Sequence, residues 1–99
     1  MSVEKLSDAR IEQLNDPENW SDSEETSMMW EMISQGMINE FLDVVQENSK
    51  IAHVRSADGR GPMWWAHEYK RPKMIQVLQK MGVSETRKDA NGIRPTDLS

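Results

Sequence analysis

The chain has 99 residues, with 12 Lys and Arg against 17 Asp and Glu, for a formal net charge of −5. That length accommodates one domain with a single core. Because the chain has no cysteine, disulfides and thiolate metal sites are excluded. No apolar run approaches the roughly 18 residues of a membrane-spanning helix, and the first residues do not form the apolar segment of a signal peptide. We therefore expect a cytoplasmic protein without membrane insertion.

The two halves of the chain differ in charge. Residues 1–49 hold two basic and twelve acidic residues, a net charge of −10, whereas residues 50–99 hold ten basic and five acidic residues, a net charge of +5. This asymmetry is typical of an acidic arm that folds back on a basic face, or of a basic face that serves an acidic partner. Two solvated surfaces of unlike charge would produce the same counts.

The polar residues 1–25 are predicted to form an acidic N-terminal arm or capping segment. Apolar spacing favours a short helix over about residues 7–15, which Pro17 ends. Trp20 is the one large apolar residue after that break. Because an exposed Trp is unfavourable, we expect Trp20 to pack on the first helix of the folded part.

An internal repeat follows, and its period is the separation of Gly59 from Gly92. Gly59-Arg60-Gly61-Pro62-Met63 recurs as Gly92-Ile93-Arg94-Pro95-Thr96. Between the two copies, apolar residues at helical spacing predict one helix from Met63 to Tyr69 and a second from Pro72 to Met81. Gly82 then stands where a left-handed residue ends a helix. A weaker copy lies one period earlier, where Met29-Trp30 takes the place of Pro62-Met63.

These residues resemble the ankyrin repeat family, whose pattern is roughly D-x-x-G-x-T-P-L-H-x-A-A, then a V-V-x-L-L helix and G-A. The matching segments are Asp89-Ala90-Asn91-Gly92-Ile93-Arg94-Pro95, Gly59 to Ala66, Met74-Ile75, Val77-Leu78 and Gly82-Val83. The period is also that of the family. The resemblance covers residues 26–99. It implies an all-α fold, an ankyrin-type stack of helix–turn–helix repeats (an α-solenoid fragment) with β-turn fingers, holding about two repeats and the start of a third.

The match departs from the family at two positions of each unit. Gly61 and Arg94 replace the Thr that caps the first helix, and Trp64 and Asp97 replace the His that links repeats. The core is expected to contain Ala66, Ile75 and Leu78, together with methionines that fill gaps between the helices. Trp30, Trp64 and Trp65 could form an aromatic platform, but their helical spacing favours the core for most of them.

No catalytic or metal site is indicated. His53 and His67 lack the spacing of metal ligands, and no nucleophile motif or phosphate-binding glycine motif is present. Asp58 and Asp89 resemble a carboxylate pair, but both lie in turns, where an Asp side chain caps its own backbone. We therefore expect a non-enzymatic protein without cofactor or metal.

The resemblance implies that binding residues lie on the fingers and first helices, which line a concave surface. The corresponding candidates are Arg60, Trp64, Glu68, Tyr69, Asn91 and Ile93. We expect a protein-interaction module whose partner is another protein or peptide, either acidic or aromatic-bearing. One alternative is a structural spacer or capping domain of a longer protein. A nucleic-acid-binding basic surface is less favoured, because the pI is 5.0 and the basic residues do not converge.

Overall fold

The computed structural model of the chain describes residues 20–98, and these residues form helices and loops without a β-strand among them. The architecture of this part is all-α, as the sequence predicts. The helix expected over residues 7–15 lies outside the described residues. In chain order, the elements are α2 (Glu24–Ser34), α3 (Ile38–Glu47), η3 (Ser49–His53), α4 (Pro62–Glu68), α5 (Pro72–Lys80) and η4 (Pro95–Leu98).

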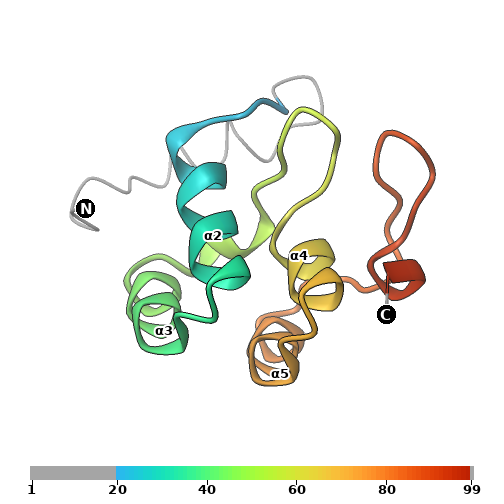
Figure 1. Cartoon of the computed structure of the whole chain (residues 1–99). Helices are drawn as coiled ribbons and strands as arrows, with labels where there is room; N and C mark the ends of the chain where they lie inside the picture. Colours follow the sequence, from blue (N-terminus) through green and yellow to red (C-terminus); the bar gives the residue numbers. More distant parts are fainter. Residues whose placement is uncertain (1–19, 99) are drawn as a thin grey trace.

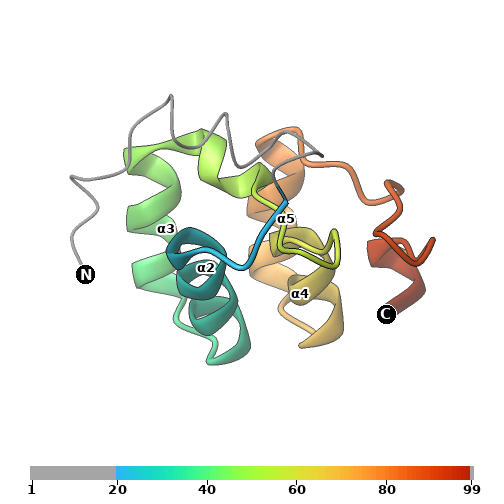
Figure 2. The same ribbon diagram turned by 90° about the horizontal axis from the view of Figure 1, so that it is seen from above.

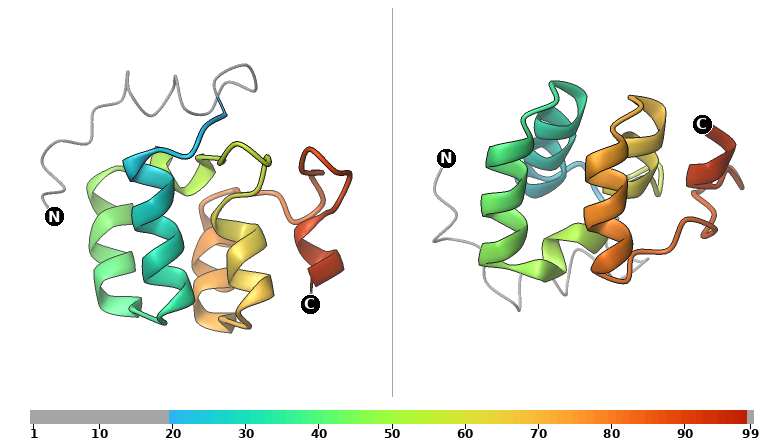
Figure 3. Two further views of the ribbon diagram at one scale, coloured as in Figure 1. Left: turned by 45° about the horizontal axis from the view of Figure 1, so that its top comes forward. Right: turned by 90° about the horizontal axis from the view of Figure 1, so that it is seen from below.

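Two helical hairpins stand side by side, α2 with α3 and α4 with α5 (Figure 1). Seen from above, α2 and α4 form one row and α3 and α5 a second row (Figure 2). The short η4 packs against α4, so α2, α4 and η4 follow one another in the first row (Figure 3). The loops before α4 and before η4 project from the same end of the molecule (Figure 1).

The first helix begins earlier than the repeat pattern suggests, because a capping box closes its N-terminus. The Thr26 N–H donates to the Ser23 hydroxyl at 3.2 Å, and the Ser23 N–H donates to the Thr26 hydroxyl at 2.8 Å. Helix α2 therefore starts at Glu24. The expected boundary between residues 25 and 26 falls inside this helix rather than before it.

Both hairpins turn through a left-handed residue, Gly36 with φ of 71° and Lys70 with φ of 56°. In each turn the next N–H donates, at 2.8 Å, to the carbonyl five positions back in the helix. Gly36 and Lys70 are one position further apart in the sequence than Gly59 and Gly92, whose separation defines the period. Since α3 has 10 residues and α5 has 9, the longer α3 restores the period by the end of the second helix.

The hydrophobic side chains form one core cluster between the two rows of helices. Ala66 and Leu78 are fully buried, as predicted, whereas Ile75 is only partly buried. Methionines fill much of this cluster, as expected for flexible side chains in an irregular core. The buried hydrophobic residues are Met28, Met29, Met32, Ile33, Phe41, Val44, Val45, Ile51, Ala52, Val54, Met63, Trp64, Trp65, Ala66, Met74 and Leu78.

The glycine at position 61 has a steric reason. Gly61 is the N-cap of α4, and a Cβ at this position would lie 2.3 Å from the backbone oxygen of Val54. No side chain fits there, so a hydroxyl cap is excluded by the close approach of the two backbone segments. Pro62 then occupies the first turn of α4, where no N–H is needed.

Truncating Leu78 tests this core. We expect Leu78→Ala to lower the free energy of unfolding by about 2–5 kcal/mol, because the side chain is fully buried and its removal leaves a cavity. Chemical denaturation of both proteins measures the difference. Gln76→Ala on the exposed side of the same helix is the matched control, and we expect it to change stability by less than about 0.5 kcal/mol. Equal stability of Leu78→Ala and the parent chain would contradict the register of α5.

Candidate functional site

Two loops with the same backbone geometry border the first row of helices, and we call them finger 1 (residues 56–60) and finger 2 (residues 89–93). In both, the N–H of the first residue donates to the carbonyl of the fifth, at 2.8 Å and 2.9 Å. Gly59 and Gly92 have φ of 81° and 80°. This confirms the prediction that both finger glycines adopt the left-handed conformation. The fingers therefore repeat with the period that the sequence predicts.

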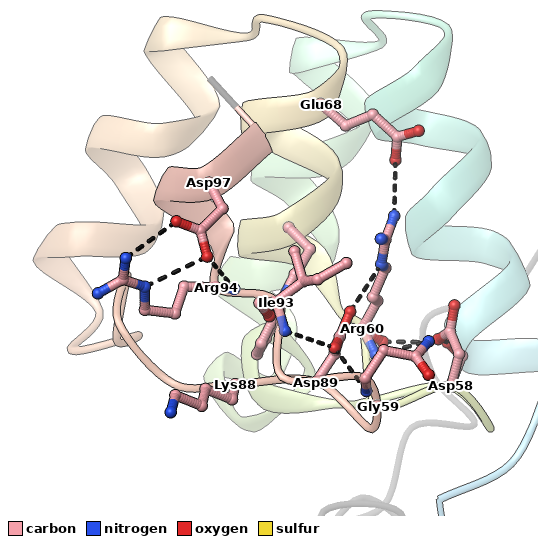
Figure 4. Close-up of polar contacts among 12 residues, drawn as sticks. Asp58, Gly59, Arg60, Glu68, Lys88, Asp89, Ile93, Arg94 and Asp97 are labelled. Carbon is pink, nitrogen blue, oxygen red and sulfur yellow. Dashed lines mark hydrogen bonds and ion pairs between the residues drawn. The ribbon is translucent and has the colours of Figure 1, made fainter.

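The carboxylate of Asp89 joins the two fingers. Its Oδ1 accepts the N–H groups of Asn91 at 2.8 Å and Ile93 at 2.9 Å, and its Oδ2 accepts the Nε–H of Arg60 at 2.9 Å (Figure 4). The Asp89 side chain has no exposed surface. Burial alone would raise the pKa of Asp89, but these three donors outweigh it and lower the pKa below its ordinary value. The charge is therefore buried with its partners in place.

Asp58 acts within its own turn in a similar way. Its side chain accepts the N–H of Arg60 at 3.0 Å and the hydroxyl of Ser56. The expected role of Asp58 and Asp89 as turn caps is thus confirmed. The fingers also meet through their backbones, because the Ala90 N–H donates to the Asp58 carbonyl at 2.9 Å.

The residues just before α2 contact finger 1 from the opposite side. The Ala57 N–H donates to the Asp22 carboxylate at 3.2 Å. The Arg55 guanidinium lies over the Trp20 ring, 3.9 Å from its centroid, and 4.6 Å from the centroid of Trp64. The sequence predicts that Trp20 packs on the first helix. It instead lies against Arg55 and Gly59, because the chain crosses finger 1 before α2 begins.

Trp64 does not belong to the accessible part of the site, which corrects its place among the candidate binding residues. Only 3% of its surface is exposed. Its indole N–H donates to the Ile93 carbonyl at 2.9 Å, so Trp64 connects α4 to finger 2.

Arg60 is accessible in part but is already engaged. Its side chain is 23% exposed, and it pairs with Asp89 at 2.9 Å and with Glu68 at 3.9 Å. Arg60 compensates the buried carboxylate, so its guanidinium is not free to bind a partner. Asn91 is exposed and Ile93 half-buried beside the same carboxylate.

Tyr69, the last sequence candidate, lies against Trp30, one of the three tryptophans that the sequence offers as an aromatic platform or as core. The rings of Trp30 and Tyr69 meet edge to face, with centroids 6.4 Å apart and an interplanar angle of 75°. Trp30 is 44% exposed, the one large hydrophobic residue of residues 20–98 with an exposed side chain. The buried positions 28, 29, 32 and 33 of α2 form one stripe that leaves position 30 outside it. The helical spacing of these apolar positions in the sequence could therefore have identified Trp30 as a surface residue.

Arg71 and Arg94 support the fold rather than a basic surface. Arg71 donates to the carbonyls of Ile33 at 3.0 Å and Ser34 at 2.8 Å, and so connects the start of α5 to the C-terminus of α2. Arg94 pairs with Asp97 at 3.0 Å (Figure 4). The guanidinium groups of these residues are therefore occupied by partners within the chain.

Comparisons of the chain with protein-family models, with curated proteins and with solved structures find no match. Within the described range, no group of three or more His, Asp or Glu side chains is arranged to hold a metal ion. No helix in residues 20–98 has both the length and the apolar character needed to cross a membrane.

The two finger glycines provide a matched pair of variants. Gly92→Ala should cost about 1–2 kcal/mol, because alanine is strained at positive φ although the space around it is open. Gly59→Ala should cost more, because its Cβ would also lie 2.8 Å from the Ala90 nitrogen and 3.0 Å from the Trp20 ring. Denaturation midpoints measure both losses. Equal losses would show that the contact of Trp20 and finger 2 with Gly59 is absent in solution.

The buried carboxylate predicts a pH dependence. Because the folded chain lowers the pKa of Asp89, its contribution to stability is present above the ordinary aspartate pKa of about 3.9 and is lost as pH falls through the folded-state pKa. We expect Asp89→Asn to lose about 1–3 kcal/mol at neutral pH, since an amide cannot replace the ion pair with Arg60. The difference in stability between parent and variant should shrink in acid. A constant difference from pH 7 to pH 2 would contradict this role.

Proposed function

We propose that the chain is an ankyrin-type repeat module that binds another protein through an aromatic surface on its first row of helices. Two observations support the repeat assignment: the fingers have the same hydrogen bonds one period apart, and each is followed by a helix of the first row. Fold alone does not specify a partner. The proposal about binding therefore depends on the exposed side chains.

The observation that carries the proposal is the aromatic pair Trp30–Tyr69. Trp30 leaves 44% of its surface exposed to water, which is unfavourable for so large an apolar side chain. The edge-to-face contact with Tyr69 holds both rings in place. Trp and Tyr are the residue types that dominate binding energy at protein interfaces. A rigid aromatic pair loses little conformational freedom when a partner covers it.

Charge near this pair favours one kind of partner. Glu31 follows Trp30 in α2 and Glu68 precedes Tyr69, and both carboxylates are exposed. Arg60, the cation that reaches Glu68, is paired with both Asp89 and Glu68. This surface therefore presents no uncompensated positive charge from Arg60, and an acidic partner would meet repulsion. We infer a peptide or protein segment that inserts an apolar or aromatic side chain and carries neutral or basic neighbours.

Replacing Trp30 tests the function. We propose to select peptides from a random displayed library on the parent chain and to measure their affinity for Trp30→Ala by calorimetry. The expected loss is about 2–4 kcal/mol of binding free energy, because the variant removes the central anchor. Melting temperature should stay nearly the same, since the side chain lies outside the core.

Gln46→Ala, an exposed substitution on α3, is the control and should bind as the parent does. Selected peptides that bind Trp30→Ala and the parent equally would contradict the aromatic surface. Failure to select any peptide above background would favour the structural spacer. Enrichment of acidic sequences without apolar residues would contradict the inferred partner chemistry.

A further inference from the structure

A cleft of about 360 Å³ lies away from the aromatic pair. Its walls are the segment from Ala52 to Arg55, the start of α4 and the residues after α5, and Trp20 completes the lining. Neither Trp30 nor Tyr69 borders it. We call it the basic cleft, because the ionisable side chains of residues 20–98 that line it are His53, Arg55 and Arg87.

Among residues 20–98, no Asp or Glu lines the basic cleft, although the protein as a whole carries a net charge of −5. Arg87 is exposed, and its side chain makes no hydrogen bond or ion pair with any residue of 20–98. Such a guanidinium beside two other basic groups makes the cleft electropositive. The charge of the cleft is therefore left for a ligand to neutralise.

The basic groups affect one another across the cleft. Burial lowers the pKa of His53, and the nearby charge of Arg87 lowers it further, against a hydrogen bond to the Met81 backbone. The pKa of Arg55 is lowered first by burial and then by Arg87 as well, with partial relief from Asp89. An anion in the cleft would remove this repulsion.

Arg55 is held rigidly in the cleft wall. Its Nε–H donates to the Gly59 carbonyl at 2.6 Å, a terminal N–H donates to the Lys88 carbonyl, and two indole rings enclose the guanidinium. Trp20 also keeps a buried indole N–H that has no hydrogen-bond partner among the described residues. Because the Arg55 side chain is already fixed in the wall of the cleft, it loses little conformational freedom when a ligand binds.

The remaining walls are apolar and are formed by Val54, Pro62, Met63 and Val83. The volume of about 360 Å³ lies at the lower end of small-molecule sites, which span roughly 300–1,000 Å³. We propose that the basic cleft binds a small organic oxyanion, a carboxylate or phosphate monoester on a short apolar or aromatic body. The oxyanion pairs with Arg87 and His53, and the body lies against the apolar wall.

The two histidines of the chain make the test direct. We propose to titrate the full chain with phenyl phosphate, and separately with benzoate, while recording the imidazole proton resonances by NMR. Saturable binding should move the resonances of His53 and raise its pKa, since the anion stabilises the protonated imidazole. The resonances of His67, which does not line the cleft, should stay in place. The tighter of the two probes identifies the oxyanion.

Two variants of equal charge locate the site. Arg87→Gln should weaken phenyl phosphate about tenfold, because it removes a charged hydrogen-bond donor from the cleft. Lys73→Gln removes the same charge at the start of α5, outside the cleft, and should bind as the parent does. Circular dichroism confirms that each variant is folded. Both residues are exposed, so neither substitution disturbs the core.

Three results would overturn the proposal. The first is an unchanged His53 spectrum at millimolar phenyl phosphate. The second is equal weakening by Arg87→Gln and Lys73→Gln, which would indicate attraction to the overall charge only. The third is equal binding of benzyl alcohol, which would show that the anion is not recognised. Since Trp30→Ala leaves the cleft intact, its affinity for phenyl phosphate should equal that of the parent, and this result is separate from the proposed protein binding.

Discussion

The buried carboxylate of Asp89 is the interaction on which the arrangement of the two fingers depends. It satisfies two backbone N–H groups of finger 2 and the guanidinium of Arg60 in finger 1. Finger 2 in turn offers the Ile93 carbonyl to the indole of Trp64 in α4. A buried charge is tolerated only when such donors surround it. One carboxylate therefore sets the position of both fingers and, through finger 2, their relation to the first row of helices.

This network decides which residues are left for function. Arg60 and Trp64 have the chemistry of binding anchors, yet the network occupies the guanidinium of one and buries the ring of the other. The accessible aromatic surface is formed instead by Trp30 and Tyr69. The proposed recognition of an apolar group and the proposed recognition of an anion therefore fall on separate surfaces, the first on the aromatic pair and the second in the basic cleft. The two surfaces can be tested independently.

The residues before α2 accept a backbone hydrogen bond from finger 1, just as finger 1 accepts one from finger 2. The Ala90 N–H of finger 2 donates to the backbone carbonyl of Asp58, and the equivalent N–H of Ala57 donates to the side chain of Asp22. A carboxylate thus replaces the carbonyl of a preceding finger. Trp20 covers Arg55 beside it and lines the basic cleft.

The sequence by itself determined the features that depend on neighbouring residues. Helical spacing predicted α4 and α5, and the finger glycines and Asp caps followed from local backbone conformation. The tertiary structure alone decided the role of Trp64 and the pairing of Trp30 with Tyr69. Trp64 finds its partner in finger 2, a full helical hairpin away along the chain, and Trp30 meets a ring from the second hairpin. The position of Trp20 has the same origin, because one-dimensional spacing cannot specify that the chain crosses finger 1 before α2 begins.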